Sequence, residues 1–336
     1  MNRRRFIQNS VAFGALSAAE FTPWQTISAF AREMDDFVRG PAVKDHPLRQ
    51  ISKHVWIIFS PDGFPTPENQ GMMCNITFVD TAKGLVVVDS GASVQIGEMA
   101  IRQVKKQFNK PVIAIINTHY HGDHWLGNHA YVDAYGSSLP LYSHPGTIKA
   151  IQGVQGNMWR TLMEQWTNQA TIGTRVVPPN QPLDDGAELN FGDVTLRVHQ
   201  YGTVHTPFDL CVEVLEDRVT LVGDVAMDRR IANMDDGSYL GTLKAYDALE
   251  KTDSTIWLPG HGEPSANVLK WNRALFEGIY RSCEQAIKDG MGLEAAKALV
   301  LKDPRVSSRA RETKGFETNI GKYVSLAYLE AEAADF

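Results

Sequence analysis

The sequence predicts an α/β protein built from two β-sheets with helices on their outer faces. Segments typical of strands alternate with helical segments in two successive rounds between residues 54 and 258. The chain has 336 residues, of which 43% are hydrophobic and 21% charged, an ordinary composition for a folded globular protein. A chain of this length can bury a substantial core without disulfides or structural metals.

The first round of elements follows a proline-containing linker at residues 41–47. The segments 54–59, 75–79 and 85–89 are rich in β-branched and aromatic side chains between Gly, Pro and Asp breaks, which predicts three strands. Three further segments complete this round: a helical pattern at 94–108, a continuous apolar run at 111–116 and a second helical pattern at 146–170. The apolar run is typical of a strand that is covered on both faces.

The second round contains the remaining predicted strands. They lie at residues 189–191, 194–200, 210–215, 219–222 and 255–258. From residue 264 the pattern is helical almost to the end of the chain. We therefore expect a main domain over residues 45–265 and a C-terminal helical extension, residues 266–336, that packs on the same domain.

Residues 1–31 have the features of an export signal. Arg3, Arg4 and Arg5 precede Phe6 and a short apolar stretch that is too short to span a bilayer. The arrangement resembles a twin-arginine signal, in which an arginine pair is followed after one residue by Phe and an aliphatic residue. Small residues at 29–31 offer a cleavage site, and those at 17–19 a weaker one. This predicts a bacterial protein exported to the periplasm after folding, with no membrane span.

Charge and cysteine content narrow the choice of partner. The net charge is −6, and Lys and Arg are concentrated only in the first five residues, so no nucleic-acid-binding surface is expected. Cys74, Cys211 and Cys283 lack the spacing of a zinc–sulfur or redox motif, and we predict no disulfide. A small molecule is the expected partner.

Metal-ligating side chains are concentrated in the segment HYHGDHWLGN, residues 119–128. His119, His121, Asp123 and His124 lie within six residues. Imidazole and carboxylate groups ligate zinc, iron or manganese, and the i, i+2 spacing projects the first two rings to one side of an extended segment. A polar loop with only local hydrogen bonds seldom collects these residue types so densely, so the segment predicts a metal site.

The segment resembles the HxHxDH motif of the metallo-β-lactamase superfamily, whose fold is an αββα sandwich with the metals at one edge. Other family elements follow in the expected order over residues 50–265. VVVDSG at 86–91 resembles the strand whose aspartate, here Asp89, supports the metal loop, and GTVHT at 202–206 resembles the segment that supplies His205. LVGD at 221–224 matches the strand end with a bridging aspartate, Asp224, and LPGHG at 258–262 matches the last histidine loop, with His261.

The resemblance implies a ligand set for two metals. His119, His121 and His205 would hold one metal, Asp123, His124 and His261 would hold the other, and Asp224 would touch both, with Asp89 behind the ligands. Such N/O donors without thiolate suit two Zn(II) ions, with iron or manganese as substitutes. Water ionised on the metals is then the expected nucleophile, and Asp123 is the carboxylate best placed to orient it or to move a proton. The histidines that match no motif position are predicted to be structural: His46, His54, His129, His144 and His199.

The predicted activity is hydrolysis of an ester, thioester or related bond. Asp224 stands where β-lactamases of the family typically carry Cys or Ser, so a β-lactam or lactone substrate is the less favoured alternative. A second alternative is an oxidoreductase similar to persulfide dioxygenases, which share the motif but use one iron, whereas here a second ligand set is complete. A non-catalytic binding protein is disfavoured because every ligand position is filled. Among branches, the chain most resembles exported hydrolases of the SoxH type and zinc metallohydrolases of periplasmic quinoprotein systems.

Two segments are candidates for the substrate pocket. Residues 60–74 fall where family members carry a flap over the metals. An apolar stripe at helical spacing consists of Met158, Trp159, Leu162, Met163 and Trp166. Packing in the core is the favoured interpretation of the stripe, and a lid over an apolar substrate is the alternative. No basic clamp for phosphate is evident, which argues against a nuclease or phosphodiesterase.

Overall fold

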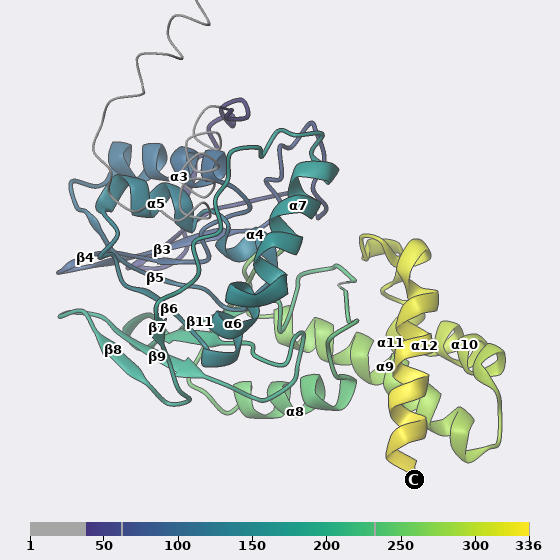
Figure 1. The fold of residues 1–336 in the computed structure, drawn as a ribbon. Helices are drawn as coiled ribbons and strands as arrows, with labels where there is room; N and C mark the ends of the chain where they lie inside the picture. Colours follow the sequence, from purple (N-terminus) through teal and green to yellow (C-terminus); the bar gives the residue numbers. More distant parts are fainter. Residues whose placement is uncertain (1–37, 62, 232, 336) are drawn as a thin grey trace, which may run out of the picture. The chain divides into compact units, whose positions relative to one another are not determined.

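The computed structural model describes residues 38–61, 63–231 and 233–335, and Figure 1 shows their fold. The predicted twin-arginine signal, residues 1–31, lies outside the described residues. Residues 40–336 form one compact unit. In the described part of the chain, no helix is both long enough and apolar enough to cross a membrane.

The first sheet has seven strands in sequence order. They are β1 (Leu48–Gln50), β2 (Val55–Ile58), β3 (Ile76–Thr81), β4 (Gly84–Val88), β5 (Val112–Ile116), β6 (Leu141–Ser143) and β7 (Gln181–Pro182). Strands β1 to β4 pair antiparallel, and β4 to β7 pair parallel. The sequence predicted β2 to β5 but missed β1, β6 and β7, because two or three residues are too few for a recognisable period.

The second sheet has five strands in the order β12-β11-β10-β9-β8. Their bounds are β8 (Glu188–Asn190), β9 (Thr195–His199), β10 (Cys211–Val214), β11 (Val219–Gly223) and β12 (Ile256–Pro259). All neighbours pair antiparallel except β11 and β12. The parallel pairing brings the carboxyl ends of β11 and β12 to one edge.

Alternation of side chains along the strands builds the sandwich. On β4, Val86 and Val88 point into the core between the sheets, where they join Val212 and Leu221 of the second sheet. Leu85 and Val87 of the same strand belong instead to the core beneath the helices. A strand with both faces buried must be apolar at every position, which explains the continuous apolar runs of β4 and β5.

Helices cover both outer faces, as the αββα prediction requires. Helices α3 (Val94–Gln107) and α5 (Asn128–Tyr135) lie on the first sheet, and α8 (Tyr239–Leu249) and α9 (Val268–Lys288) on the side of the second (Figure 1). The predicted sandwich is therefore confirmed. The sequence analysis missed α8, whose apolar residues are spread around the helix rather than gathered on one face.

The helical pattern at residues 146–170 corresponds to three consecutive helical elements that end at Trp166, with an interruption that the pattern did not show. The segment contains α6 (Pro145–Ala150), a π-helical stretch η1 (Ile151–Gln155) and α7 (Gly156–Trp166). Gly153 has φ −85° and ψ −136°, outside the helical region, so the chain is kinked there. The apolar period continues across the kink, and for that reason the sequence pattern alone could not reveal it.

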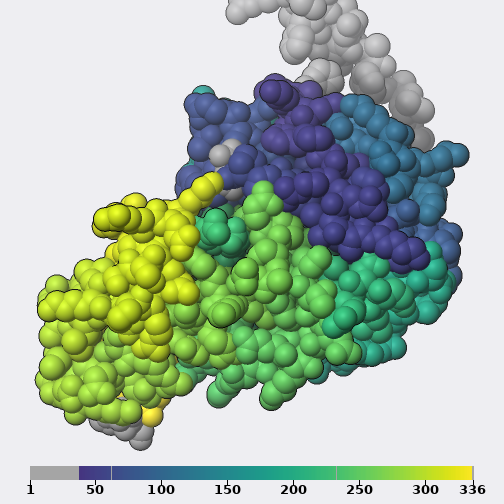
Figure 2. All heavy atoms as spheres, turned by 180° about the vertical axis from the view of Figure 1, so that it is seen from behind, coloured from purple at the N-terminus to yellow at the C-terminus, as the bar shows by residue number. Residues whose placement is uncertain are grey.

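The C-terminal helices pack on α8 and α9. They are α10 (Leu293–Lys302), α11 (Pro304–Ser307) and α12 (Phe316–Asp335). Tyr239, Phe276 and Tyr323 bring α8, α9 and α12 into one aromatic cluster. The segment before α12 also reaches the first half of the fold, because Lys314 donates to the Pro61 carbonyl, and yellow and purple residues meet in Figure 2.

Glu330 of α12 fastens the last helix to the start of α8. Its carboxylate accepts hydrogen bonds from the Ser238 hydroxyl at 2.6 Å and from the backbone N–H groups of Tyr239 at 2.7 Å and Leu240 at 3.2 Å. An anion at a helix N-terminus satisfies donors that have no partner within the helix.

We predict that Glu330→Ala lowers the free energy of unfolding by about 1–3 kcal/mol, because several hydrogen bonds to a charged acceptor are lost. Chemical denaturation followed by circular dichroism measures this change. Glu332→Ala, at an exposed position of the same helix, is the matched control and should have little effect. Equal stabilities of the two variants would contradict the role of Glu330.

Candidate metal centre

The HxHxDH segment follows the apolar strand β5 and lies at the edge between the sheets. His119 and His121 lie in the loop after β5, and Asp123 and His124 lie on the short helix α4 (Gly122–Trp125). All four side chains are buried. Because the chain turns from loop to helix here, the side chains of His119 and His121 point toward one place and those of Asp123 and His124 toward a neighbouring one.

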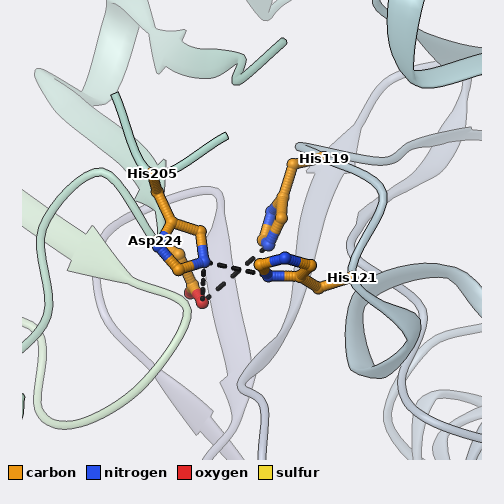
Figure 3. Close-up of side chains that lie close together, drawn as sticks. All are labelled: His119, His121, His205 and Asp224. Carbon is orange, nitrogen blue, oxygen red and sulfur yellow. Dashed lines mark hydrogen bonds and ion pairs between the residues drawn. The ribbon is translucent and has the colours of Figure 1, made fainter. Parts of the chain in front are cut away.

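The first cluster consists of His119, His121, His205 and Asp224, whose donor atoms all lie within 4.8 Å of one another. Figure 3 shows the two motif imidazoles facing His205 and Asp224 across a small gap. His121 Nδ1 is 2.9 Å from His205 Nε2, and Asp224 Oδ2 is 3.5 Å from His205 Nε2 and 3.9 Å from His119 Nε2. Residues far apart in the sequence thus converge on one point.

The second cluster consists of Asp123, His124 and His261. Asp123 Oδ2 lies 3.2 Å from His261 Nε2 and 3.4 Å from His124 Nε2. Asp224 also faces this cluster, with Oδ1 at 3.5 Å from His124 Nε2 and Oδ2 at 3.3 Å from His261 Nε2. Asp224 is therefore shared by the two clusters, and the structure brings together all seven residues that the sequence singled out.

The donor atoms fit metal ions. Four donors at zinc-bond distances of 2.0–2.1 Å in a tetrahedron are separated from one another by about 3.3–3.4 Å, and the separations here scatter around that value. Buried donor atoms also lack hydrogen-bond partners within the described residues: His119 Nε2, Asp123 Oδ2, His124 Nε2 and Asp224 Oδ1. Buried polar atoms without partners are costly, and a cation at each cluster would satisfy them.

Electrostatics favour the ligating protonation state of His121, His205 and the two carboxylates, whereas the neighbouring carboxylates raise the pKa of His124 and His261, which would each lose a proton when a cation binds. Burial lowers the pKa of His121 to about 4 and that of His205 to about 3, so both imidazoles are neutral at physiological pH. Burial opposes ionisation of Asp123 and Asp224, but the adjacent His124 and His261 hold the pKa of both carboxyls well below the ordinary value. Neutral imidazoles and charged carboxylates are the binding forms.

Asp89 orients the second cluster from behind. Its carboxylate accepts hydrogen bonds from Thr118 N at 2.8 Å and Thr118 Oγ1 at 2.9 Å, and His124 Nδ1 lies 2.8 Å from Asp89 Oδ2. Donation from Nδ1 leaves His124 Nε2 free to face the cluster. Cys74 Sγ lies 3.5 Å from the same Nδ1, so Cys74, Asp89 and His124 gather around a nitrogen that points away from the candidate metals.

Two further groups position ligands, and the sequence analysis missed both. The Met73 carbonyl lies 2.7 Å from His261 Nδ1 and fixes that ring in the same way. Asp209 accepts hydrogen bonds from the backbone N–H groups of His205 and Thr206, and burial raises the pKa of Asp209 to about 7. A backbone carbonyl has no sequence signature, and an aspartate four residues after a histidine is too common to be noticed.

Gly260 allows the two strand ends to approach each other. A Cβ at this position would lie 2.4 Å from Asp224 Oδ1 and 2.8 Å from His124 Cε1. Gly223 has φ +51°, and a Cβ there would lie 2.9 Å from Thr118 Oγ1. The glycines of VGD and LPGHG are therefore required by close packing around the ligands.

A cavity of about 510 Å³ opens over both clusters. Trp159, Met163 and Trp166 of α7 line it, so three of the five stripe residues form a wall of the cavity, and the same three also belong to or pack against the core beneath the helices, as the favoured interpretation expected. Phe64 of the predicted flap lines the cavity as well, whereas Met72 of the same segment is buried in the core.

The cavity also contains basic side chains that the sequence analysis did not find. Arg230, Lys314 and Lys322 line it, from the loop after β11 and from the C-terminal extension. These three residues are far apart in the sequence, so no local sequence pattern predicted a basic group in the cavity. The five histidines predicted to be structural belong to neither ligand cluster.

The fold and this site define an αββα protein with a paired metal-ligand centre at its strand ends. The model of the metallo-β-lactamase superfamily matches residues 69–261, more than half of the chain. The chain therefore belongs to the metallo-β-lactamase superfamily.

Relatives in sequence include two hydrolases. The linear primary-alkylsulfatase of Pseudomonas sp. (strain ATCC 19151) is 37% identical over 54 residues, which are 16% of this chain and 10% of that protein. Metallo-β-lactamase type 2 of Bacillus cereus is 35% identical over 81 residues, which are 23% of this chain and 28% of that protein. The matched segments thus span less than a third of either relative.

Solved structures share the fold. A metallo-β-lactamase from Pontibacter korlensis aligns with TM-score 0.55 and 19% identity over 68% of this chain and 98% of that chain. A double mutant of the sec-alkyl sulfatase PisA1 aligns with TM-score 0.66 and 17% identity over 85% of this chain and 50% of that chain. At such low identity these likenesses establish the architecture alone.

We predict that Asp89→Asn weakens zinc binding at the second cluster by about ten- to a hundredfold, because the carboxylate that orients His124 is lost. Competition with a chromogenic chelator measures the affinity. Asp80→Asn, which removes a surface pair with Lys110, is the control and should leave the affinity unchanged. Unaltered zinc affinity in Asp89→Asn would exclude the positioning role.

Proposed function

We propose that this chain is a dinuclear zinc hydrolase that cleaves an ester, a thioester or a related bond. The observation that carries the proposal is the pair of buried ligand clusters joined by Asp224 on the floor of a cavity. Two relatives, an alkylsulfatase and a β-lactamase, are hydrolases. The finer likeness to SoxH-type and quinoprotein-associated hydrolases is part of the proposal.

The chain's own residues would divide the work around the metals. His119, His121 and His205 would hold one zinc, Asp123, His124 and His261 the other, and Asp224 would contact both. When bound, the two ions supply a pair of Lewis acids and a water that ionises near neutral pH. Asp123 lines the cavity as a carboxylate, so it would orient a water molecule there and serve as the group that moves a proton.

The donor set favours this reading over its alternatives. A single-iron oxidoreductase would leave buried donors of one cluster without a partner, whereas two ions satisfy both clusters. The thiolate-free donors suit zinc, with iron or manganese as chemically acceptable substitutes. Asp224 in the shared position makes a β-lactam or lactone the less favoured substrate.

We predict that His261→Ala keeps the first metal, loses most of the second and reduces hydrolysis by at least about a hundredfold. Removal of one neutral imidazole strands no buried charge, so the fold should survive. Loss of one ion removes transition-state stabilisation of several kcal/mol, and about 1.4 kcal/mol is tenfold in rate.

Metal stoichiometry, turnover and circular dichroism of each variant test this division of ligands. Turnover is screened on chromogenic carboxylic esters, thioesters, sulfate esters and β-lactams. His199→Ala, at a histidine that contacts Glu213 outside the clusters, is the control and should retain two metals. Two metals and the wild-type rate in His261→Ala would show that His261 is not a ligand.

We also propose that the protein reaches the periplasm through a twin-arginine signal, and this proposal rests on the sequence alone. We predict that Arg3→Lys combined with Arg4→Lys traps the protein in the cytoplasm, because the twin-arginine pathway requires the pair. Cell fractionation measures the distribution. Arg5→Lys is the control and should leave export to the periplasm unchanged. Unchanged export of the double variant would contradict the proposal of a twin-arginine signal.

A further inference from the structure

A line of aromatic rings leads from the first cluster to the cavity mouth. The Trp159 ring centroid lies 4.8 Å from that of His121, Trp166 lies 6.1 Å from Trp159, and Phe64 lies 5.2 Å from Trp166. Phe64 is 57% exposed, so the line ends at the surface. All three aromatic residues line the cavity, and together they offer an extended apolar wall that an alkyl chain or an aromatic group can cover.

Basic groups lie on the other part of the cavity lining. Arg230 donates to the Gly63 carbonyl, and its Nη1 is buried without a hydrogen-bond partner within the described residues. Lys314 donates to the Pro61 carbonyl, and neither cation forms an ion pair with a described carboxylate. Lys322 differs, because it pairs with Asp235 at 2.6 Å.

A second donor in the cavity also lacks an acceptor. Trp159 Nε1 is buried and has no hydrogen-bond partner within the described residues. Both N–H donors without a partner, Arg230 Nη1 and Trp159 Nε1, are buried atoms of residues that line the cavity. A buried donor without an acceptor is costly, and an acceptor-rich ligand would remove that cost.

We infer that the cavity binds an amphiphilic oxyanion, a molecule with an apolar chain or ring on one side and a carboxylate, sulfate or similar group on the other. The inference rests on the proposed function in that it names the substrate class of the same site. Arg230 is the specificity-determining residue, with Lys314 beside it. The guanidinium fork suits a planar or tetrahedral oxyanion through two parallel hydrogen bonds.

The positions of these groups orient the substrate. The Trp159 ring lies against that of His121 of the first cluster, whereas Arg230 lines the cavity together with Asp224, which both clusters share. The apolar part therefore lies along the aromatic wall that starts at the first cluster, and the oxyanion lies toward Arg230. The bond that is cleaved lies between them or is the ester bond to the oxyanion itself.

A purely structural role is the competing explanation for the two cations. Both donate to carbonyls of the segment 60–74, Arg230 to Gly63 and Lys314 to Pro61, and could serve only to fasten this segment. Such a role would change the binding of charged and neutral ligands alike. A role in anion recognition changes the ratio between them, and this ratio separates the two explanations.

Calorimetric titration of the zinc-loaded protein tests the inference without turnover. The probes are octane-1-sulfonate, octan-1-ol and octyltrimethylammonium, which share the chain and differ in charge. We expect the sulfonate to bind about tenfold or more tighter than the alcohol, and the cation to bind worst. Arg230→Met should abolish the preference, and Arg230→Lys should restore part of it.

The neighbouring Arg229 provides a matched control. It is exposed and faces Glu312, so Arg229→Met should keep the preference. If Arg230→Met fails to fold or to load zinc, Lys314→Met is measured in its place, with loss of part of the preference expected. Equal binding of sulfonate and alcohol to the wild-type protein, or an unchanged ratio in the variant measured, overturns the inference.

Hydrolysis assays then separate this inference from the proposed function and identify the source of the oxyanion. A 4-nitrophenyl ester with a free terminal carboxylate, its methyl-capped form and octyl sulfate are compared. Preference for the free carboxylate places the oxyanion away from the cleaved bond, and cleavage of octyl sulfate places it at that bond. Turnover without any preference for charge would support the hydrolase and contradict the anion site. Binding of the sulfonate without turnover of any ester would support the anion site and contradict the hydrolase.

Discussion

The buried carboxylate of Asp224 is the constraint on which the rest of the structure depends. It faces four imidazoles from three separate segments, and its side chain is buried. Burying a carboxylate is costly unless charge and hydrogen bonds compensate it. Here the compensation requires the loops after β5, β9, β11 and β12 to meet at one edge of the sandwich, and the sandwich provides that meeting point because these strands all end there.

The close packing around the ligand clusters follows from the same need to bring these loops together. Gly260 and Gly223 remove side-chain volume where the strand ends cross, and Asp89 adopts φ +58° to reach both Thr118 and His124. A non-glycine residue in that region stores strain that the surrounding contacts must offset. The backbone strain at Asp89 is therefore the cost of holding the His124 ring in its orientation.

Sequence reasoning recovered the ligand centre and the strands around it because both carry local signals. The motif at residues 119–124 is dense, and β4 and β5 are long apolar runs forced by burial on two faces. The kink at Gly153 and the helix α8 were missed because one leaves the apolar period intact and the other spreads its apolar residues around the axis. Short strands such as β7 exist only through pairing with a neighbour, which a single sequence does not show.

The cavity is the part least accessible from sequence, since its character is set by tertiary placement. Arg230 comes from the loop after β11 and Lys314 from the chain before α12, and neither belongs to a recognisable motif, whereas Trp159 of α7 belongs to an apolar stripe whose pattern fits core packing equally well. The C-terminal helices matter for this reason: Glu330 fixes α12 on α8, and the chain leading into α12 carries Lys314 to the segment 60–74. The candidate ligands therefore depend on where the strands of the sandwich end, whereas the basic part of the cavity lining depends on how the extension docks.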